Sequence, residues 1–122
     1  MPVLVQGQVR PYRRAVTKAL EAAEALAALS RCRHKHGAVL IKRGSVIAAG
    51  TNQQREDPRY SAFPLASMHA EENVLRQAGW RAHGATLVVV RVNQRGDLMP
   101  SAPCKRCSGL IERSGIRRVV HT

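Results

Sequence analysis

The 122-residue chain has the length of one domain, long enough to bury a hydrophobic core, and its 44% apolar content is typical of globular proteins. With no transmembrane-length stretch, no signal peptide and an odd count of three cysteines, the sequence predicts a single domain over residues 1–122 in the reducing cytoplasm, away from membranes. Twenty Lys and Arg against eight Asp and Glu give a formal net charge of +12, which favours anionic or phosphorylated partners.

The first predicted element is a helix over residues 11–29. Pro11 suits the first turn of a helix, and the segment is rich in Ala, Leu and Glu, which favour helix. Apolar residues recur along it at helical spacing, namely Ala15, Ala19, Leu20, Ala23, Leu26 and Ala27. These residues are expected to form the face that packs on the core.

A β-hairpin is predicted next. After a basic bend at residues 31–36, two short apolar runs at 38–42 and 45–50 flank an Arg-Gly pair. Apolar runs around a two-residue turn that contains glycine are typical of a hairpin. Residues 51–64 are polar and contain two prolines, so they predict a loop.

A second helix is expected to begin near Ser67, whose side chain suits an N-cap, and to end near Gly79. Residues 85–93 form a nearly continuous apolar run, which is typical of a strand buried on both faces. The segment 94–103 contains a glycine and two prolines and therefore predicts a loop.

Residues 104–115 predict a last helix and residues 116–122 a last short strand. The order is then helix, hairpin, helix, strand, helix, strand. Strands separated by helices must be joined by crossovers, so the later strands should be parallel. The fold class is α/β, and we expect a three-layer α/β/α sandwich around a mixed sheet with an N-terminal hairpin and parallel later strands.

Two short motifs carry the chemistry: His-Ala-Glu at 69–71 and Pro-Cys-Lys-Arg-Cys at 103–107. In this order they match the zinc deaminase signature H-x-E…P-C-x-x-C. Both motifs fall at predicted helix starts, which can converge on one edge of the sheet. His69, Cys104 and Cys107 would give Zn²⁺ three ligands and leave the fourth tetrahedral position open for water, as in catalytic sites.

Glu71 lies two residues beyond His69, close to the metal without needing to bind it. A carboxylate there is suited to take a proton from water and to deliver it to a ring nitrogen and a leaving amine. The competing interpretations are a redox CxxC pair and a closed structural zinc site with Cys32 as fourth ligand. A zinc-stabilised nucleic-acid-binding protein without activity would have no use for Glu71, so this residue discriminates between the hypotheses.

Over residues 30–121 the chain resembles the cytidine and deoxycytidylate deaminase superfamily. MHAEENVL is similar to the first zinc motif of deoxycytidylate-type members, and APCKRCSGLIERSGIRRVV to the second motif with the strand that follows. CRHKHGAVLIKRGSVIAAGTN resembles the hairpin that opens their core. The resemblance implies that Asn52 contacts the sugar of a substrate, that the backbone N–H of Ala70 contacts its base, and that the protein is a homo-oligomer.

The leading hypothesis is zinc-dependent hydrolytic deamination of cytosine to uracil in a nucleoside or nucleotide. The alternative is a deaminase of cytosine or adenine within single-stranded DNA or RNA, which the net charge favours. Tyr60 and Phe63 precede the zinc helix and are available to stack on such a base. A small cyclic compound outside nucleotide metabolism is a third kind of substrate. The basic residues that would meet a phosphate are Arg31, Arg33, Lys35, Lys105 and Arg106.

Overall fold

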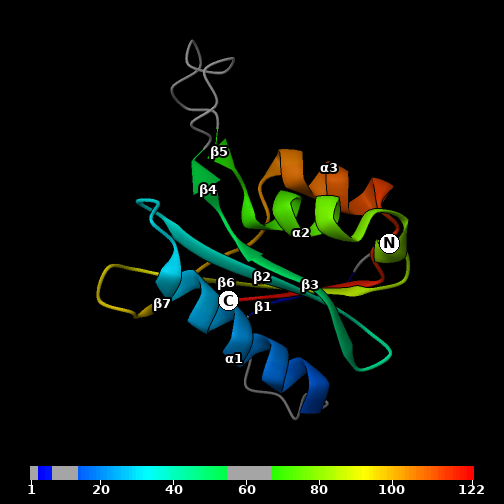
Figure 1. Ribbon diagram of the computed structural model, residues 1–122, viewed down its shortest axis with the longest axis horizontal. Helices are drawn as coiled ribbons and strands as arrows, with labels where there is room; N and C mark the ends of the chain where they lie inside the picture. Colours follow the sequence, from blue (N-terminus) through cyan, green and yellow to red (C-terminus); the bar gives the residue numbers. More distant parts are fainter. Residues whose placement is uncertain (1–2, 7–13, 55–66) are drawn as a thin grey trace.

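The computed structural model describes residues 3–6, 14–54 and 67–122. Most of these residues belong to helices and strands (Figure 1). In chain order the elements are β1 (Val3–Gln6), α1 (Arg14–Leu29), β2 (Lys35–Lys42), β3 (Ser45–Thr51), β4 (Gln53–Gln54), β5 (Ser67–Met68), α2 (Ala70–Ala78), η2 (Gly79–Ala82), β6 (Thr86–Val92), β7 (Leu98–Met99), α3 (Lys105–Arg113) and β8 (Arg118–His121).

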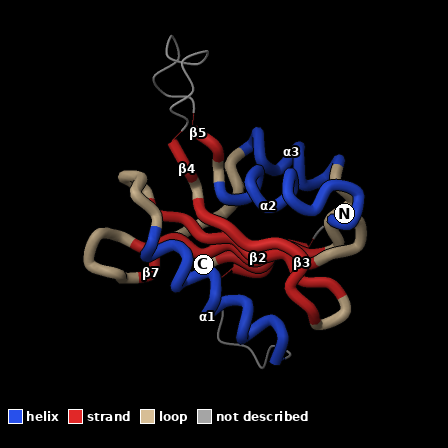
Figure 2. The backbone as a smooth tube through the Cα atoms, viewed as in Figure 1, coloured by secondary structure: helices blue, strands red, loops and turns tan. Residues whose placement is uncertain are grey.

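The main sheet has the strand order β1-β8-β6-β2-β3, with β7 paired to β6. Strand β6 is parallel to β8 and antiparallel to β2, and β1 is parallel to β8. Helix α1 covers one face of the sheet, while α2 and α3 lie together on the other (Figures 1 and 2). The predicted three-layer α/β/α sandwich, its mixed sheet, its hairpin and its parallel later strands are confirmed.

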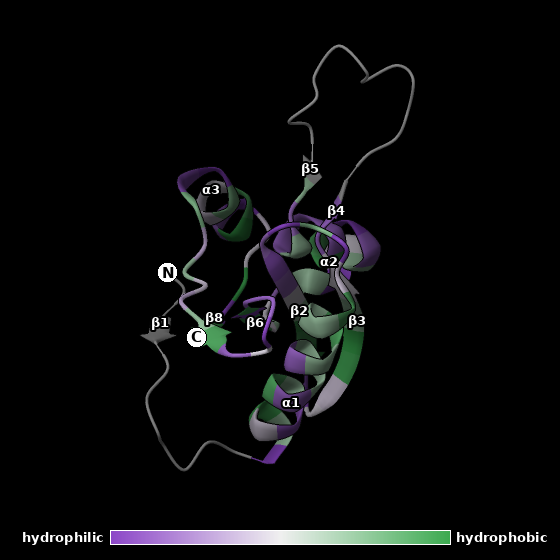
Figure 3. Cartoon of the chain, turned by 90° about the vertical axis from the view of Figure 1, so that its left-hand side faces the viewer, coloured by the Kyte–Doolittle hydropathy of each residue, from purple (hydrophilic) through white to green (hydrophobic). Residues whose placement is uncertain are grey.

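The two faces of the sheet bury separate apolar clusters. Along β2, Leu40 packs with residues of α2 and α3, whereas the preceding residue, Val39, points to the other face and packs with α1. Strand β6 alternates in the same way, with Val89 on the α2 side and Val88 on the α1 side. Burial on both faces explains the nearly continuous apolar run predicted to be a buried strand. Helix α3 carries both hydrophilic and hydrophobic residues (Figure 3), as expected for a helix with one buried side.

The hairpin of β2 and β3 is confirmed, including its turn. Arg43 and Gly44 both have positive φ, 53° and 79°, which is the requirement of a type I′ turn between antiparallel strands. The basic bend is shorter than predicted. Lys35 and His36 already belong to β2, because they pair with Val92 and Arg91 of β6.

Helix α1 approaches β2 at one glycine. A Cβ atom on Gly37 would stand 2.7 Å from the backbone nitrogen of Ala27 and closer still to the carbonyl oxygen of Ala23. Ala23 and Ala27 themselves are fully buried, so small residues on both elements let the helix lie directly on the sheet. The alanines predicted to face the core therefore do so at Ala19, Ala23 and Ala27.

The predicted start of the second helix is wrong. Ser67 does not cap α2; it lies in β5, where Ser67 pairs with Gln54 and Met68 with Gln53. This extended pairing delays the helix to Ala70, with His69 as its N-cap. The predicted end near Gly79 is confirmed, since Gly79 has a positive φ of 58° and is the C-cap, although the turn η2 continues from it.

Four short strands among the described residues were not predicted. Strands β4 and β5 pair with each other. Strand β7 interrupts the expected loop at 94–103 by pairing Leu98 with Val92, and β1 adds an edge strand to the sheet beside β8. The predicted helix start at 11–13 and most of the predicted loop 51–64, with Tyr60 and Phe63, lie outside the described residues. Among the described helices, none has the length and apolar character needed to span a membrane.

Candidate metal centre

The two motifs meet where α2 and α3 begin. His69 is the N-cap of α2, in extended conformation, and its carbonyl oxygen accepts a hydrogen bond from the Asn73 backbone N–H at 2.9 Å. Cys104 has the same place and conformation before α3, where its carbonyl oxygen accepts from the Ser108 N–H at 2.8 Å. Both side chains therefore project from the first turn of a helix, as the sequence predicted.

Hydrogen bonds to the end of the sheet fix the segment that leads to Cys104. The buried Ser101 hydroxyl donates to the Val89 carbonyl oxygen at 3.0 Å, and the Ser101 N–H donates to the Thr122 carbonyl oxygen at 2.8 Å. The Thr122 hydroxyl in turn donates to the Met99 carbonyl oxygen at 2.7 Å. Sequence reasoning missed Ser101 and Thr122, because an isolated hydroxyl residue in a loop carries no pattern.

One nitrogen and two sulfur donors converge at this point. The Nδ1 atom of His69 lies 3.2 Å from Sγ of Cys107 and 3.6 Å from Sγ of Cys104. All three ligand atoms lie within 4.8 Å of one another. Tetrahedral coordination with ordinary Zn–N and Zn–S bond lengths places nitrogen and sulfur about 3.5 Å apart. The observed spacing fits a single Zn²⁺ ion.

The local charges also suit a cation. Burial raises the pKa of the Cys107 thiol, and the neighbouring Glu71 carboxylate and the Cys104 side chain raise it further. A buried cluster of groups that lose protons to become anionic is stabilised by a positive ion, which favours the thiolate form. The backbone N–H of Cys107 already donates to Sγ of Cys104 at 3.4 Å, so the start of α3 supports negative charge on that sulfur.

Glu71 is the second residue of α2 and is only 4% exposed. Burial raises the pKa of its carboxyl above the ordinary glutamate value, although its own backbone N–H, His69 and a side-chain hydrogen bond to Cys107 partly oppose the shift. The carboxyl therefore lies against the donor cluster without belonging to it. The adjacent Ala70 is fully buried and opens the helix, where the first N–H groups have no partner within the helix.

Asn52 lies at the end of the hairpin, and most of the hydrogen-bonding groups of its side-chain amide already have partners. Its side-chain oxygen accepts from the Ser30 hydroxyl at 2.6 Å and from the His36 backbone N–H at 3.0 Å, and its nitrogen donates to the His34 carbonyl oxygen. An amide has two acceptor sites and two donor hydrogens. Among the described residues, one N–H of Asn52 has no partner and is available for a further hydrogen bond.

Two amide side chains of α2 that sequence reasoning missed join this helix to the edge strand β3. Asn73 donates to the Thr51 carbonyl oxygen and Gln77 to the Ala49 carbonyl oxygen, each at 2.9 Å. Asn73 also accepts from Gln77 at 3.1 Å. Their spacing of four residues on one helical face was visible in the sequence, but nothing indicated that the face meets strand carbonyls.

The alternative with Cys32 as a fourth ligand has no support among the described residues. The Cys32 thiol lies against the Asn52 carbonyl oxygen at 3.5 Å and is absent from the donor cluster. The three cysteines are all free. Of the predicted phosphate contacts, Arg106 forms an ion pair with Glu72 at 3.1 Å, and Lys35 donates to the Ala28 carbonyl oxygen at 3.5 Å.

Comparisons with known proteins agree with this geometry. Residues 10–122 match the family described as the cytidine and deoxycytidylate deaminase zinc-binding region. A curated relative, the riboflavin biosynthesis protein RibD of Aquifex aeolicus (strain VF5), is 37% identical over 87 residues, which make up 69% of this chain and 20% of RibD. The chain thus spans about a fifth of the length of that relative.

Two solved structures resemble most of the chain. The dCMP deaminase from the cyanophage S-TIM5, in apo form, is 25% identical with a TM-score of 0.68, and the match covers 93% of this chain and 87% of that chain. A structure from studies of A-to-I editing by tRNA:A34 deaminases is 28% identical with a TM-score of 0.60, covering 87% and 77%. The chain belongs to the cytidine and deoxycytidylate deaminase family, and its cofactor is the Zn²⁺ ion for which His69, Cys104 and Cys107 lie close enough together.

Proposed function

We propose that this protein is a hydrolytic deaminase that converts the cytosine base of a free nucleoside or nucleotide to uracil and releases ammonia. The observation that carries the proposal is the buried Glu71 carboxyl, which lies against a three-donor metal cluster without being one of its donors. A closed structural site takes four protein ligands and has no role for an additional buried acidic group beside them.

In this reaction each of the site residues has a separate task. His69, Cys104 and Cys107 would hold Zn²⁺, which as a Lewis acid would activate water as the nucleophile. Glu71 accepts a proton from water and passes protons to the ring nitrogen of the base and to the departing amine. Burial raises the pKa of the Glu71 carboxyl toward neutral pH. A group whose pKa lies closer to the working pH can both accept and release a proton.

Two further groups are assigned to substrate binding. The backbone N–H of Ala70, at the start of α2, donates to the base, and the remaining N–H of Asn52 donates to the sugar. The three hydrogen bonds that engage the rest of the Asn52 amide fix its orientation before substrate arrives. A contact whose geometry is fixed in advance costs less entropy when the substrate binds.

A mononucleotide is favoured over a polynucleotide by the breadth of the likeness to the cyanophage dCMP deaminase, which spans nearly all of both chains. The alternative, a base within RNA or DNA, has two observations in its favour. One is the net charge of +12, and the other is the 28% identity to the structure from the tRNA:A34 deaminase studies. Net charge attracts polyanions in general and does not by itself define a site.

A substrate panel tests the proposal. Zinc-loaded protein is incubated with cytidine, deoxycytidine, their monophosphates, adenosine and single-stranded oligonucleotides, and deaminated products are separated by chromatography. We expect turnover of a cytosine nucleoside or mononucleotide. Turnover of adenosine alone, or of none of the small substrates, would contradict the proposal.

Salt separates the two substrate classes. A polynucleotide held by several Lys and Arg contacts releases counterions, so its apparent affinity falls by orders of magnitude, about 10³–10⁵-fold between low and moderate salt for 6–10 phosphate contacts. A mononucleotide offers one phosphate, so its KM should change little. A steep salt profile, with turnover confined to oligonucleotides, would favour the alternative instead.

The proposal also includes a cytoplasmic location and assembly into a homo-oligomer. Thiolate ligands must stay reduced, which suits the cytoplasm. Assembly into a homo-oligomer follows from the family resemblance, and size-exclusion chromatography with light scattering measures it. A monomeric particle with full activity would contradict this part.

A further inference from the structure

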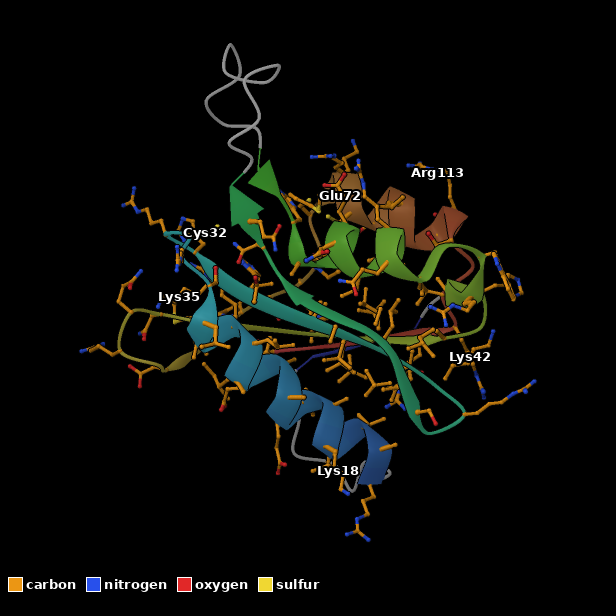
Figure 4. The ribbon with its side chains drawn as sticks, in the orientation of Figure 1. Lys18, Cys32, Lys35, Lys42, Glu72 and Arg113 are labelled. Atoms are coloured by element: carbon orange, nitrogen blue, oxygen red, sulfur yellow. The ribbon has the colours of Figure 1, made fainter. Side chains whose placement is uncertain are left out.

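Glu72 is a buried carboxylate beside the metal centre that the proposed reaction does not use. Its side chain is 6% exposed and lies at the contact between α2 and α3 (Figure 4). Its Oε2 atom accepts from Arg76 at 2.9 Å and from Arg106 at 3.1 Å. Its Oε1 atom has no hydrogen-bond partner among the described residues. A carboxylate is costly to bury unless it is paired, so these two arginines account for its presence.

The two arginines bind the same oxygen from different elements. Arg76 lies four residues beyond Glu72 on α2, so this ion pair stays within one helix. Arg106 belongs to the first turn of α3 and lies between Cys104 and Cys107 in the chain. The Arg106 pair therefore joins the first turn of α2 to the first turn of α3.

Those two turns supply all the metal donors. His69 precedes α2 by one residue, while Cys104 and Cys107 frame the start of α3. The distance between the imidazole and the thiols consequently depends on how the two helix starts are held together. An ion pair between the same two turns is placed to fix that distance.

We propose that Glu72 and Arg106 form a positioning pair, which binds neither metal nor substrate but holds the donors of α2 and α3 at the spacing that Zn²⁺ requires. The inference rests on the metal site of the proposed function. It replaces the expectation that Arg106 meets a substrate phosphate, because the guanidinium is directed to Glu72. Arg76, which shares the carboxylate without crossing to α3, has no part in this role.

The test is the rate at which zinc-loaded protein releases its metal to an excess of a chromogenic chelator. Loss of a residue that orients metal ligands typically weakens metal binding by about 10–100-fold, so Arg106→Gln should release zinc about tenfold faster than wild type. Glu72→Gln should behave alike. Arg76→Gln is the matched control, since it removes one bond to the same oxygen, and its rate should stay within about twofold of wild type. Arg106→Lys keeps a cation in reach and should recover part of the loss.

A second readout reports donor geometry directly. In protein loaded with Co²⁺ in place of zinc, the visible absorption of the cobalt should change in Arg106→Gln and stay unchanged in Arg76→Gln. Thermal unfolding of each variant shows whether it is folded. If Arg106→Gln does not fold, the comparison of Arg106→Lys with Arg76→Gln decides, with faster release expected only in the former.

The results separate this inference from the proposed function, because metal release requires no turnover. Faster release in Arg106→Gln with a normal rate in Arg76→Gln supports the pair even if the substrate panel shows no deamination. Equal rates in the two arginine variants, or a wild-type rate in Arg106→Gln, would overturn it. Wild-type protein that holds no zinc would overturn both the pair and the metal site.

Discussion

The Nδ1 atom of His69 lies 3.2 Å from Sγ of Cys107, although 38 residues separate them in the chain. The contact exists because α2 and α3 pack side by side on one face of the sheet and begin at the same end (Figure 1). Two helix starts thus bring together donors that neither helix could supply alone. The zinc content of cysteine variants should therefore depend on which cysteine is replaced.

Cys104→Ser and Cys107→Ser should each lose most of the zinc, while Cys32→Ser should keep about one zinc per chain, as expected for a three-ligand site. Cys32 is the matched control because its thiol contacts the Asn52 carbonyl oxygen and not the donor cluster. Metal analysis of the purified variants measures the content. Full zinc in both Cys104→Ser and Cys107→Ser, or loss of zinc in Cys32→Ser, would refute the ligand assignment.

Gly37→Ala should lower the free energy of unfolding by about 1–3 kcal/mol, the usual cost of overpacking. The added Cβ would collide with the backbone of α1 at Ala23, which cannot move independently of the helix. Gly109→Ala is the control, because there the nearest atom is the end of the flexible Arg113 side chain at 3.2 Å, and alanine in a helix gains roughly 0.5–1 kcal/mol over glycine. Urea unfolding of both variants measures the difference. Equal stability of Gly37→Ala and wild type would show that the helix is not held this closely.

His36 should make folding stability depend on pH. Burial lowers the pKa of its imidazole below the ordinary histidine value of 6.5, and the charges of Arg91, His69 and His34 lower it further, against the opposing hydrogen bond with the His34 backbone. As pH falls below 6.5, the unfolded chain binds a proton that the folded chain does not, so stability present above pH 6.5 is lost as pH approaches the lowered folded value.

Thermal unfolding of zinc-loaded wild type and His36→Gln between pH 7.5 and 5.5 measures this effect. Wild type should lose more stability over that range than the glutamine variant. Other titrating groups, the metal donors included, are common to both proteins and cancel in the comparison. Parallel curves for the two proteins would show that His36 takes up its proton equally well in the folded and unfolded states.

Local patterns were enough to predict most of the fold. The helical spacing in residues 14–29, the Arg-Gly turn and the apolar run of β6 each have a local physical cause, and each is confirmed. The start of α2 was not predictable in this way. Ser67 is a good N-cap by its chemistry, but the pairing of β5 with β4, a partner distant in sequence, holds it in an extended strand.

In the candidate site, too, local patterns predicted some residues, and contacts between distant residues determine the others. The three donors follow from two spaced motifs, and the structure brings them together as predicted. Of the residues that support the site, Ser101, Thr122 and Asn73 were missed, and Arg106 was singled out only as a phosphate contact. All four act through contacts with residues far along the chain. A single polar residue shows no periodicity, so its partner becomes known only when the fold is known.

The most direct test of the central claim is the turnover of zinc-loaded Glu71→Gln. Glutamine has nearly the shape of glutamate but cannot carry a proton between water, ring nitrogen and leaving amine. The variant should fold and keep its zinc, and its rate should fall by at least the roughly 10²–10⁴-fold typical of a lost general acid–base group. Near-normal turnover of the cytosine substrate, with zinc content unchanged, would contradict the account, because Glu71 would then be only a carboxylate at a helix start.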